Sequence, residues 1–352
     1  MITPVPTVRS MASYALADLG DAQAISLAQN ESAHPPSPKA IAAAQTALAQ
    51  GALYPDPDWH SLRAAIAATH PVDPRHILCG AGSMELIGTL IRAFAGPGDD
   101  VLGTQYGYLF VATACQQAGA TYRQAAEPDL RVDVDCLLAA VTPQTRIVFL
   151  CNPGNPTGTR LPNADIIRLR NALPQDVLLV VDQAYAEFDD QDHAAIFDLV
   201  TQNSTCVTRT LSKAYGLAGA RVGWGAFPCQ IGDQMRKLLN PNNIPGASQA
   251  MATAALADQT YMQTTVRQTA ATRDRFANRL RAIGLHVPTS HTNFVLIRFA
   301  DDAATQHANA ALTNAGYLLR GMGGYGLADC LRATIGSDTH MNAVANILES
   351  LS

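Results

Sequence analysis

The sequence predicts an α/β protein with a largely parallel sheet between helices, followed by a smaller α+β region. From about residue 76, short β-branched runs alternate with helical stretches, which is the pattern of a parallel sheet connected by helices. The apolar run at 177–181 lacks apolar–polar alternation, as is typical of a strand covered on both faces. After residues 240–246 (NPNNIPG) the chain becomes rich in alanine and arginine. With 352 residues the chain can form one large and one smaller domain.

The alternating part of the chain contains the elements of the expected parallel sheet. An amphipathic pattern marks a helix at 83–95, and a glycine closes a second helix at 108–119. In chain order we expect strands at 76–80, 99–103, 145–153, 176–185, 205–210 and 220–227, and a third helix at 163–173. The strand at 145–153 runs directly into a polar turn.

The remainder of the chain predicts a second, smaller unit. Residues 247–283 form one or two long helices, and short strands follow at 292–299 and 330–336, with helices between and after them. We therefore expect an N-terminal arm that joins the small domain, a large domain and a small C-terminal domain, at residues 1–30, 31–245 and 246–352.

Composition and charge exclude several classes of protein. The net charge is −5, and the 24 basic residues are scattered, so we expect no nucleic-acid partner. No run approaches the roughly 20 apolar residues that cross a bilayer, and Pro4, Pro6 and Asp18 interrupt any signal-peptide core. The seven cysteines are far apart and never form a C-x-x-C pair, and the nine histidines show no ligand spacing. We expect a cytoplasmic protein without a metal site or a membrane partner.

Polar clusters follow several of the predicted strands, where ligands bind in open α/β sheets. Gly82 and Ser83 lie where a strand meets a helix, so backbone N–H groups there could hold a phosphate; a plain tight turn is the alternative. Residues 151–159 (CNPGNPTGT) contain two Asn-Pro steps and form a rigid turn. Asp182 closes the most apolar strand and needs a cationic or donating partner, unless it caps the next helix. Tyr185 would face the same crevice.

The segment 208–227 carries cations among small residues. Lys213 and Arg221 lie between glycines and alanines, with no acid in the segment to pair with them. A phosphate cradle, a polar turn, a buried acid and this lysine together suit a ligand that has a phosphate, a basic ring nitrogen and an aldehyde. Pyridoxal 5′-phosphate is such a ligand.

With these motifs the chain resembles the fold-type I aminotransferases of class I/II, and within them the histidinol-phosphate aminotransferase branch. The resemblance covers roughly residues 26–336. Its motifs are the N-terminal 26–38 (SLAQNES…PPSP), 53–57 (LYPDP), 154–158 (GNPTG), 180–188 (VVDQAYAEF), the lysine segment TLSKAYGLAGARVGW and 330–336 (CLRATIG). The chain departs from the family at Gly154, where asparagine is usual, at Met84, where an acid is frequent, and near Thr104, where proline is usual. The resemblance implies a mostly parallel seven-stranded sheet in a large cofactor-binding domain.

The resemblance also implies roles for individual residues. Lys213 would form the Schiff base with the cofactor, and Asp182 would keep the ring nitrogen protonated. Asn155 and Tyr185 would bond the phenolate oxygen, and Tyr106 would stack on the ring. The phosphate would be bound by a further set, namely Gly82, Ser83, Thr210, Ser212 and Arg221.

Two implied features concern the partner subunit and the substrate. Tyr54 would reach the phosphate in the neighbouring subunit, which makes the active site a property of a homodimer. Arg332 would bind the substrate carboxylate, beside Asn155. Arg320 would read a substrate phosphate, or else be a solvated loop arginine, and Tyr14 or His34 of the N-terminal arm would line the same region or lie on the surface.

The implied reaction is a ping-pong amino transfer between a small-molecule donor and a 2-oxo acid, with 2-oxoglutarate as the expected acceptor. Lys213 would act as the base, with its pKa lowered by Arg221 and by a desolvated pocket. Histidinol phosphate is the first expectation for the donor. An aromatic or other neutral L-amino acid, or a decarboxylase of the threonine-phosphate type on the same scaffold, are the alternatives.

Overall fold

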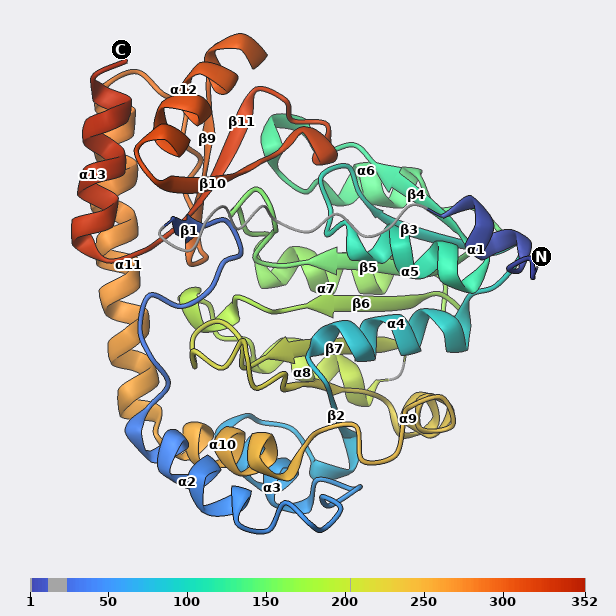
Figure 1. Cartoon of the computed structure of the whole chain (residues 1–352). Coiled ribbons are helices and arrows are strands. Elements are labelled where there is room, and N and C mark those ends of the chain that lie inside the picture. Colours follow the sequence, from blue (N-terminus) through green and yellow to red (C-terminus); the bar gives the residue numbers. More distant parts are fainter. Residues whose placement is uncertain (1, 12–23, 203, 352) are drawn as a thin grey trace.

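The computed structural model describes residues 2–11, 24–202 and 204–351. Its main feature is a seven-stranded sheet with the order β2-β8-β7-β6-β5-β3-β4 (Figure 1). β8 runs in the opposite direction to the other six strands, which are parallel to one another. The strands are β2 (Ile77–Gly80), β3 (Asp100–Thr104), β4 (Thr121–Ala125), β5 (Thr145–Cys151), β6 (Leu178–Asp182), β7 (Thr205–Thr210) and β8 (Gly223–Ala226). The predicted α/β class with a mostly parallel sheet is confirmed.

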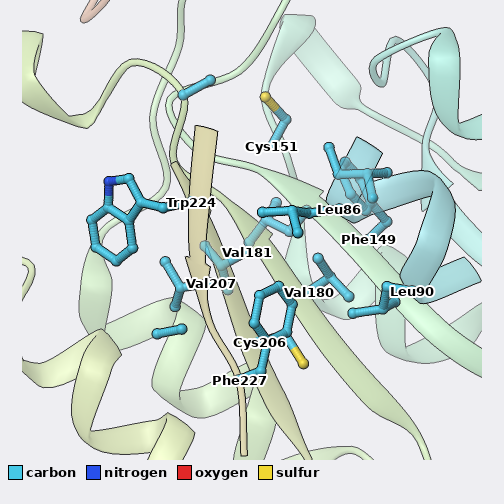
Figure 2. Packing of buried hydrophobic residues seen from close by; sticks show 14 of the residues in the cluster. Leu86, Leu90, Phe149, Cys151, Val180, Val181, Cys206, Val207, Trp224 and Phe227 are labelled. Carbon is cyan, nitrogen blue, oxygen red and sulfur yellow. The ribbon is translucent and has the colours of Figure 1, made fainter. Parts of the chain in front are cut away.

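Helices cover both faces of this sheet. The direction of each crossover decides its face, because β–α–β connections are right-handed. The chain moves toward β4 through α4 (Ser83–Phe94) and α5 (Phe110–Ala118), and toward β2 through α7 (Asn163–Ala172) and α8 (Ala194–Thr201). The two pairs therefore lie on opposite faces (Figure 1). Figure 2 shows how Leu86 and Leu90 of α4 pack near the apolar strand residues.

A second sheet of four strands lies beside the first, with the order β1-β10-β11-β9. Its strands are β1 (Ile25–Leu27), β9 (Phe294–Arg298), β10 (Tyr317–Gly321) and β11 (Cys330–Thr334). It shares a separate apolar cluster with α11 (Gln259–Ala282), α12 (Asp302–Asn314) and α13 (Asp338–Glu349). The N-terminal segment supplies β1, which pairs in parallel with β10.

The segment 247–283 forms two helices, α10 (Gly246–Ala257) and α11. The buried side chains of α10 belong to the core of the large sheet, whereas those near the end of α11 belong to the second cluster. Figure 1 shows α10 beside α2 and α3, with α11 running from there toward the second sheet. The domain boundary near residue 246 stays a prediction.

The other helices are α1 (Pro6–Ser10), α2 (Pro38–Leu48), α3 (His60–Thr69), α6 (Val134–Ala139) and α9 (Cys229–Arg236). Short 3₁₀ turns lie at Pro74–His76, Pro128–Leu130, Ala186–Phe188 and Gly323–Tyr325. Within the described part of the chain, no helix has the length and apolar character of a membrane span.

Candidate active site

A cavity of about 420 Å³ lies where β5, β6 and β7 end, between the two sheets. Eleven of the candidate cofactor- and substrate-binding residues line it, from strands of both sheets and from the loops that follow strands of the large sheet: Gly82, Ser83, Asn155, Asp182, Tyr185, Thr210, Ser212, Lys213, Arg221, Arg320 and Arg332. The cavity therefore gathers side chains from segments that span residues 82–332 of the chain.

Lys213 brings an amine into this cavity. Its Nζ donates to the carbonyl oxygen of Gln29 at 3.2 Å and lies 6.0 Å from the centre of the Tyr185 ring. Burial lowers the pKa of Lys213 to about 8, with the positive charge of Arg332 acting in the same direction and Glu31 opposing it. A larger fraction of its amine is therefore neutral near pH 8 than for an exposed lysine.

Asp182 is held in a row of three residues across neighbouring strands. Cys151 of β5 and Thr208 of β7 are its register partners on either side. The Thr208 hydroxyl donates to Oδ1 of Asp182 at 2.7 Å, and the Cys151 thiol lies 3.9 Å from Oδ2. Burial raises the pKa of Asp182 to about 6 against the hydrogen bonds from Thr208 and Cys151. Such a carboxylate is suited to a cationic N–H group placed in the cavity.

Asn155 and Arg332 connect the two sheets across the cavity. Nη1 of Arg332 donates to Oδ1 of Asn155 at 2.6 Å, and Nη2 donates to the carbonyl oxygen of Ala28 at 2.8 Å. The guanidinium carbon lies 5.2 Å from the centre of the Phe294 ring. Arg332 is buried, so its charge faces the cavity in a fixed position and suits a carboxylate.

A cradle for a phosphate lies at the N-terminus of α4. Gly82 precedes this helix with φ of +81°, and a Cβ there would lie 2.4 Å from Nη2 of Arg221. Gly223 of β8 leaves similar room, because a Cβ there would lie 2.2 Å from the backbone nitrogen of Ser83. The hydroxyls of Thr210 and Ser212 complete the cradle, 2.9 Å from each other. A helix N-terminus with an arginine and two hydroxyls fits a phosphate group.

Two arginines face the cavity from the second sheet. Arg320 of β10 lies directly opposite Arg332 of β11 in the antiparallel pair, and both line the cavity. Like charges at such positions destabilise a sheet. Their proximity therefore favours a ligand that brings negative charge.

Residues 28–31, near the N-terminus of the chain, line the cavity. Three consecutive residues contact three of the candidate site residues: Ala28 accepts from Arg332, Gln29 accepts from Lys213, and the Asn30 amide donates to the Tyr185 hydroxyl at 2.9 Å. Glu31 lines the cavity as well. The predicted N-terminal motif is thus part of the site itself.

Three residues named from the sequence lie outside the cavity lining. Tyr106 packs against the small apolar cluster around Met322, and Tyr108 lines the cavity instead. Tyr54 is 88% exposed, and His34 is half-buried. Tyr14 lies outside the described residues.

The sequence alone did not single out Asn30, Cys151 or Thr208. Asn30 lies in a motif of the resemblance that assigns it no role, and Cys151 begins the polar turn at residues 151–159 without a role of its own. The signal for Cys151 and Thr208 was their place at strand ends beside Asp182. That signal needs the strand order and register, which the sequence pattern does not provide.

A group of Asp189, Asp190 and His291 lies outside the cavity and has the spacing of metal ligands. Arg160 pairs with both aspartates. Its guanidinium offsets one of their two negative charges.

Comparisons with known proteins agree with this geometry. The family model "Aminotransferase class I and II" matches residues 22–351. A histidinol-phosphate aminotransferase of Jannaschia sp. (strain CCS1) is 40% identical over 99% of this chain and 98% of its own length. The crystal structure of a histidinol-phosphate aminotransferase from Sinorhizobium meliloti in complex with pyridoxal-5′-phosphate superposes with a TM-score of 0.92, at 29% identity, over 99% of this chain and 96% of that one. An aspartate aminotransferase from Thermus thermophilus shares the fold, with a TM-score of 0.87 at 20% identity over the whole of both chains.

Proposed function

Because the chain belongs to the class I and II aminotransferase family, we propose that it transfers an amino group from histidinol phosphate to 2-oxoglutarate with pyridoxal 5′-phosphate as cofactor. The cofactor is supported by the fit of the cavity, which offers a phosphate cradle at Gly82 and Arg221, a buried acid at Asp182 and an amine at Lys213. The substrate is supported by the paired arginines. The relatives' names point the same way.

The chain's own residues hold the cofactor at three points. Ser83, Ser212 and Arg221 would bind the phosphate, Asp182 would pair with the ring nitrogen, and Tyr185 and Asn155 would bond the ring oxygen. When bound, the cofactor supplies an aldehyde that accepts the amino group and a protonated ring that takes up electrons from the substrate. The bonds from Thr208 and Cys151 orient Asp182 for this contact.

Lys213 moves the proton in each half-reaction. Its amine, with a pKa lowered to about 8, would take the proton from Cα of the donor in the first half-reaction and return a proton to Cα of the new amino acid in the second. The carbonyl of Gln29 holds the amine in the cavity. Burial of the surrounding side chains keeps water from that proton.

The main observation that supports histidinol phosphate as the substrate is the Arg320–Arg332 pair across β10 and β11. Histidinol phosphate brings a doubly charged phosphate, and 2-oxoglutarate brings two carboxylates. Each substrate can therefore offset both guanidinium charges in its turn. A neutral aromatic amino acid carries a single carboxylate and would satisfy only one of the two arginines.

The test compares donors in wild type and in Arg320→Ala. Glutamate formation from 2-oxoglutarate is followed with histidinol phosphate or phenylalanine as donor. With histidinol phosphate we expect kcat/KM of the variant to fall by about 100-fold, since about 3 kcal/mol is typical for a lost charge-assisted contact. With phenylalanine the loss should stay within a few-fold.

Equal losses for both donors would contradict the phosphate contact and favour an aromatic amino-acid aminotransferase. Release of CO₂ from the donor without glutamate formation would contradict amino transfer and favour the decarboxylase. Arg123→Ala, on the edge strand β4 and outside the cavity lining, is the matched control and should leave both donors unchanged.

The assembly and the compartment belong to the same proposal. A homodimer with a shared site is supported by Tyr54, which is exposed and lies outside the cavity of its own chain. A reducing compartment such as the cytoplasm is supported by the seven cysteines, all of which are free thiols.

A further inference from the structure

The hydroxyl of Tyr185 is bonded by a residue from the far N-terminal part of the chain. The Nδ2 amide of Asn30 donates to Oη of Tyr185 at 2.9 Å. Both side chains are buried, with 2% and 3% of their surface exposed. The bond spans 155 positions of the sequence, so its formation depends on the folded position of the N-terminal segment.

The orientation of the Asn30 amide is fixed by its other contacts. The Thr334 hydroxyl donates to Oδ1 of Asn30 at 3.3 Å and accepts from the Asn30 backbone N–H at 2.9 Å. The Asn293 amide donates to the Asn30 carbonyl oxygen at 3.0 Å. Since Oδ1 faces a hydroxyl donor on β11, the NH₂ group of the amide must face Tyr185.

The backbone conformation of Asn30 also favours asparagine at this position. Its φ is +55°, which is the left-handed region that asparagine, aspartate and glycine tolerate best. Of these three, only asparagine offers a side-chain N–H to Tyr185. The local conformation and the hydrogen bond therefore select the same residue.

A tyrosine hydroxyl carries a single hydrogen. Since the Tyr185 oxygen accepts from Asn30, that hydrogen is free to point elsewhere, and among the described residues Oη has no other hydrogen-bond partner. Tyr185 lines the cavity. Burial also raises the pKa of Tyr185, so the hydroxyl keeps its hydrogen at neutral pH.

We propose that Asn30 is a positioning residue that makes Tyr185 a hydrogen-bond donor into the cavity, toward the oxygen of the bound cofactor ring. The inference rests on the proposed function, because it takes pyridoxal 5′-phosphate as the group that accepts the bond. Asn30 itself acts only through Tyr185.

The test is a double-mutant cycle of Asn30→Asp and Tyr185→Phe. Aspartate has the shape of asparagine and tolerates the same backbone, but its carboxylate accepts the Tyr185 hydrogen and so draws it away from the cavity. The readouts are the dissociation constant of the apoenzyme for pyridoxal 5′-phosphate, from fluorescence quenching, and the midpoint of a pH titration of the bound cofactor's absorbance.

We expect Asn30→Asp to weaken cofactor binding by about tenfold, as one lost hydrogen bond predicts, and to shift the midpoint of the absorbance titration. In the Tyr185→Phe background the same change should alter the dissociation constant by no more than about twofold and the titration midpoint by no more than about 0.3 pH unit. A purely structural role of Asn30 would give equal effects in both backgrounds, which would overturn the proposal, as would an unchanged affinity when Tyr185 is present.

Two further variants serve as controls for the cycle. Asn30→Gly suits the positive φ and removes the amide without adding a charge, so it replaces Asn30→Asp in the cycle if the aspartate variant does not fold. Asn314→Asp makes the same substitution at an exposed position and should change nothing. If the wild-type apoenzyme itself does not bind pyridoxal 5′-phosphate, the proposed function fails. Normal wild-type binding with an additive cycle contradicts only the role of Asn30.

Discussion

At the scale of single residues, the chemistry of Lys213 depends on its surroundings more than on its type. Burial makes the largest contribution to the shift in its pKa, with Arg332 and Arg221 adding to it. The sequence indicated a cation among small residues and named Arg221 as a cause. It could not name Arg332, which lies 119 positions away and reaches the cavity only through the second sheet.

The lowered pKa predicts how the apoenzyme captures pyridoxal 5′-phosphate as pH changes. Only the neutral amine reacts, and its fraction rises about tenfold between pH 6 and pH 7 when the pKa is about 8. The rate, from stopped-flow absorbance, should therefore rise with pH and level off above about pH 8. N-acetyl-lysine methylamide, measured in parallel, corrects for titration of the cofactor and should still be rising at pH 9. A flat rate from pH 6 to 8, or a midpoint near 10, would contradict the shift.

The neighbours of Asp182 mark the limit of prediction at this scale. A carboxylate at the end of an apolar strand can be recognised from the sequence as a buried acid that needs partners. Its donors, Cys151 and Thr208, follow from the register of β5 and β7 against β6. Register depends on how the strands pack, so short apolar runs do not specify it.

At the scale of elements, long apolar strands and amphipathic helices were predictable, and exposed or short elements were not. Strands β5, β6 and β7 are buried over nearly their whole length, and β5 and β6 stand out as apolar runs. The edge strand β4 is largely exposed and polar, and β1 has three residues. Neither carries a pattern strong enough to be recognised, because their pairing comes from a neighbour already in place.

The start of α4 yields a test of the phosphate cradle. In Gly82→Ala the new methyl group would meet Nη2 of Arg221 at 2.4 Å, and φ of +81° would be strained. We expect the affinity of the apoenzyme for pyridoxal 5′-phosphate to fall at least about tenfold, or about 1.4 kcal/mol, as measured by equilibrium dialysis.

Gly96→Ala is the matched control for Gly82→Ala. The same methyl group would meet no atom within 4 Å at this position, and the residue lies between α4 and β3, away from the cavity. Cofactor affinity should therefore stay at the wild-type value. Unchanged affinity in Gly82→Ala, or an equal loss in both variants, would contradict a phosphate cradle at α4.

At the scale of the whole molecule, the cavity depends on both sheets and on the N-terminal segment. Asp182 ends a strand of the large sheet and Lys213 lies in the turn that follows β7. Arg320 and Arg332 come from the second sheet, and Asn30 from the segment that follows β1. The order of motifs along the chain predicted which residues would gather. How the second sheet lies against the first depends on long-range packing, which cannot be predicted from local sequence patterns.

The exposed loop that carries Tyr54 leads to a test of the shared site. Lys213→Ala and Tyr54→Ala should each be weakly active alone, because one lacks the amine and the other lacks the proposed contact to the neighbouring subunit's phosphate. In a mixed dimer, one site collects both changes and the other site is intact. Equal amounts, mixed and allowed to exchange subunits, should therefore recover about a quarter of wild-type activity.

The recovery should appear only if the subunits exchange and if Tyr54 acts across the interface. Sedimentation should give about twice the 37.3 kDa of one chain, and recovery should follow subunit exchange in time. Mixing Lys213→Ala with Asp182→Asn is the control, because both changes lie in the cavity of one chain and every mixed dimer has two damaged sites. No recovery with Tyr54→Ala despite exchange would show that each subunit carries a complete site of its own. Recovery in the control would contradict the placement of Lys213 and Asp182 in one site.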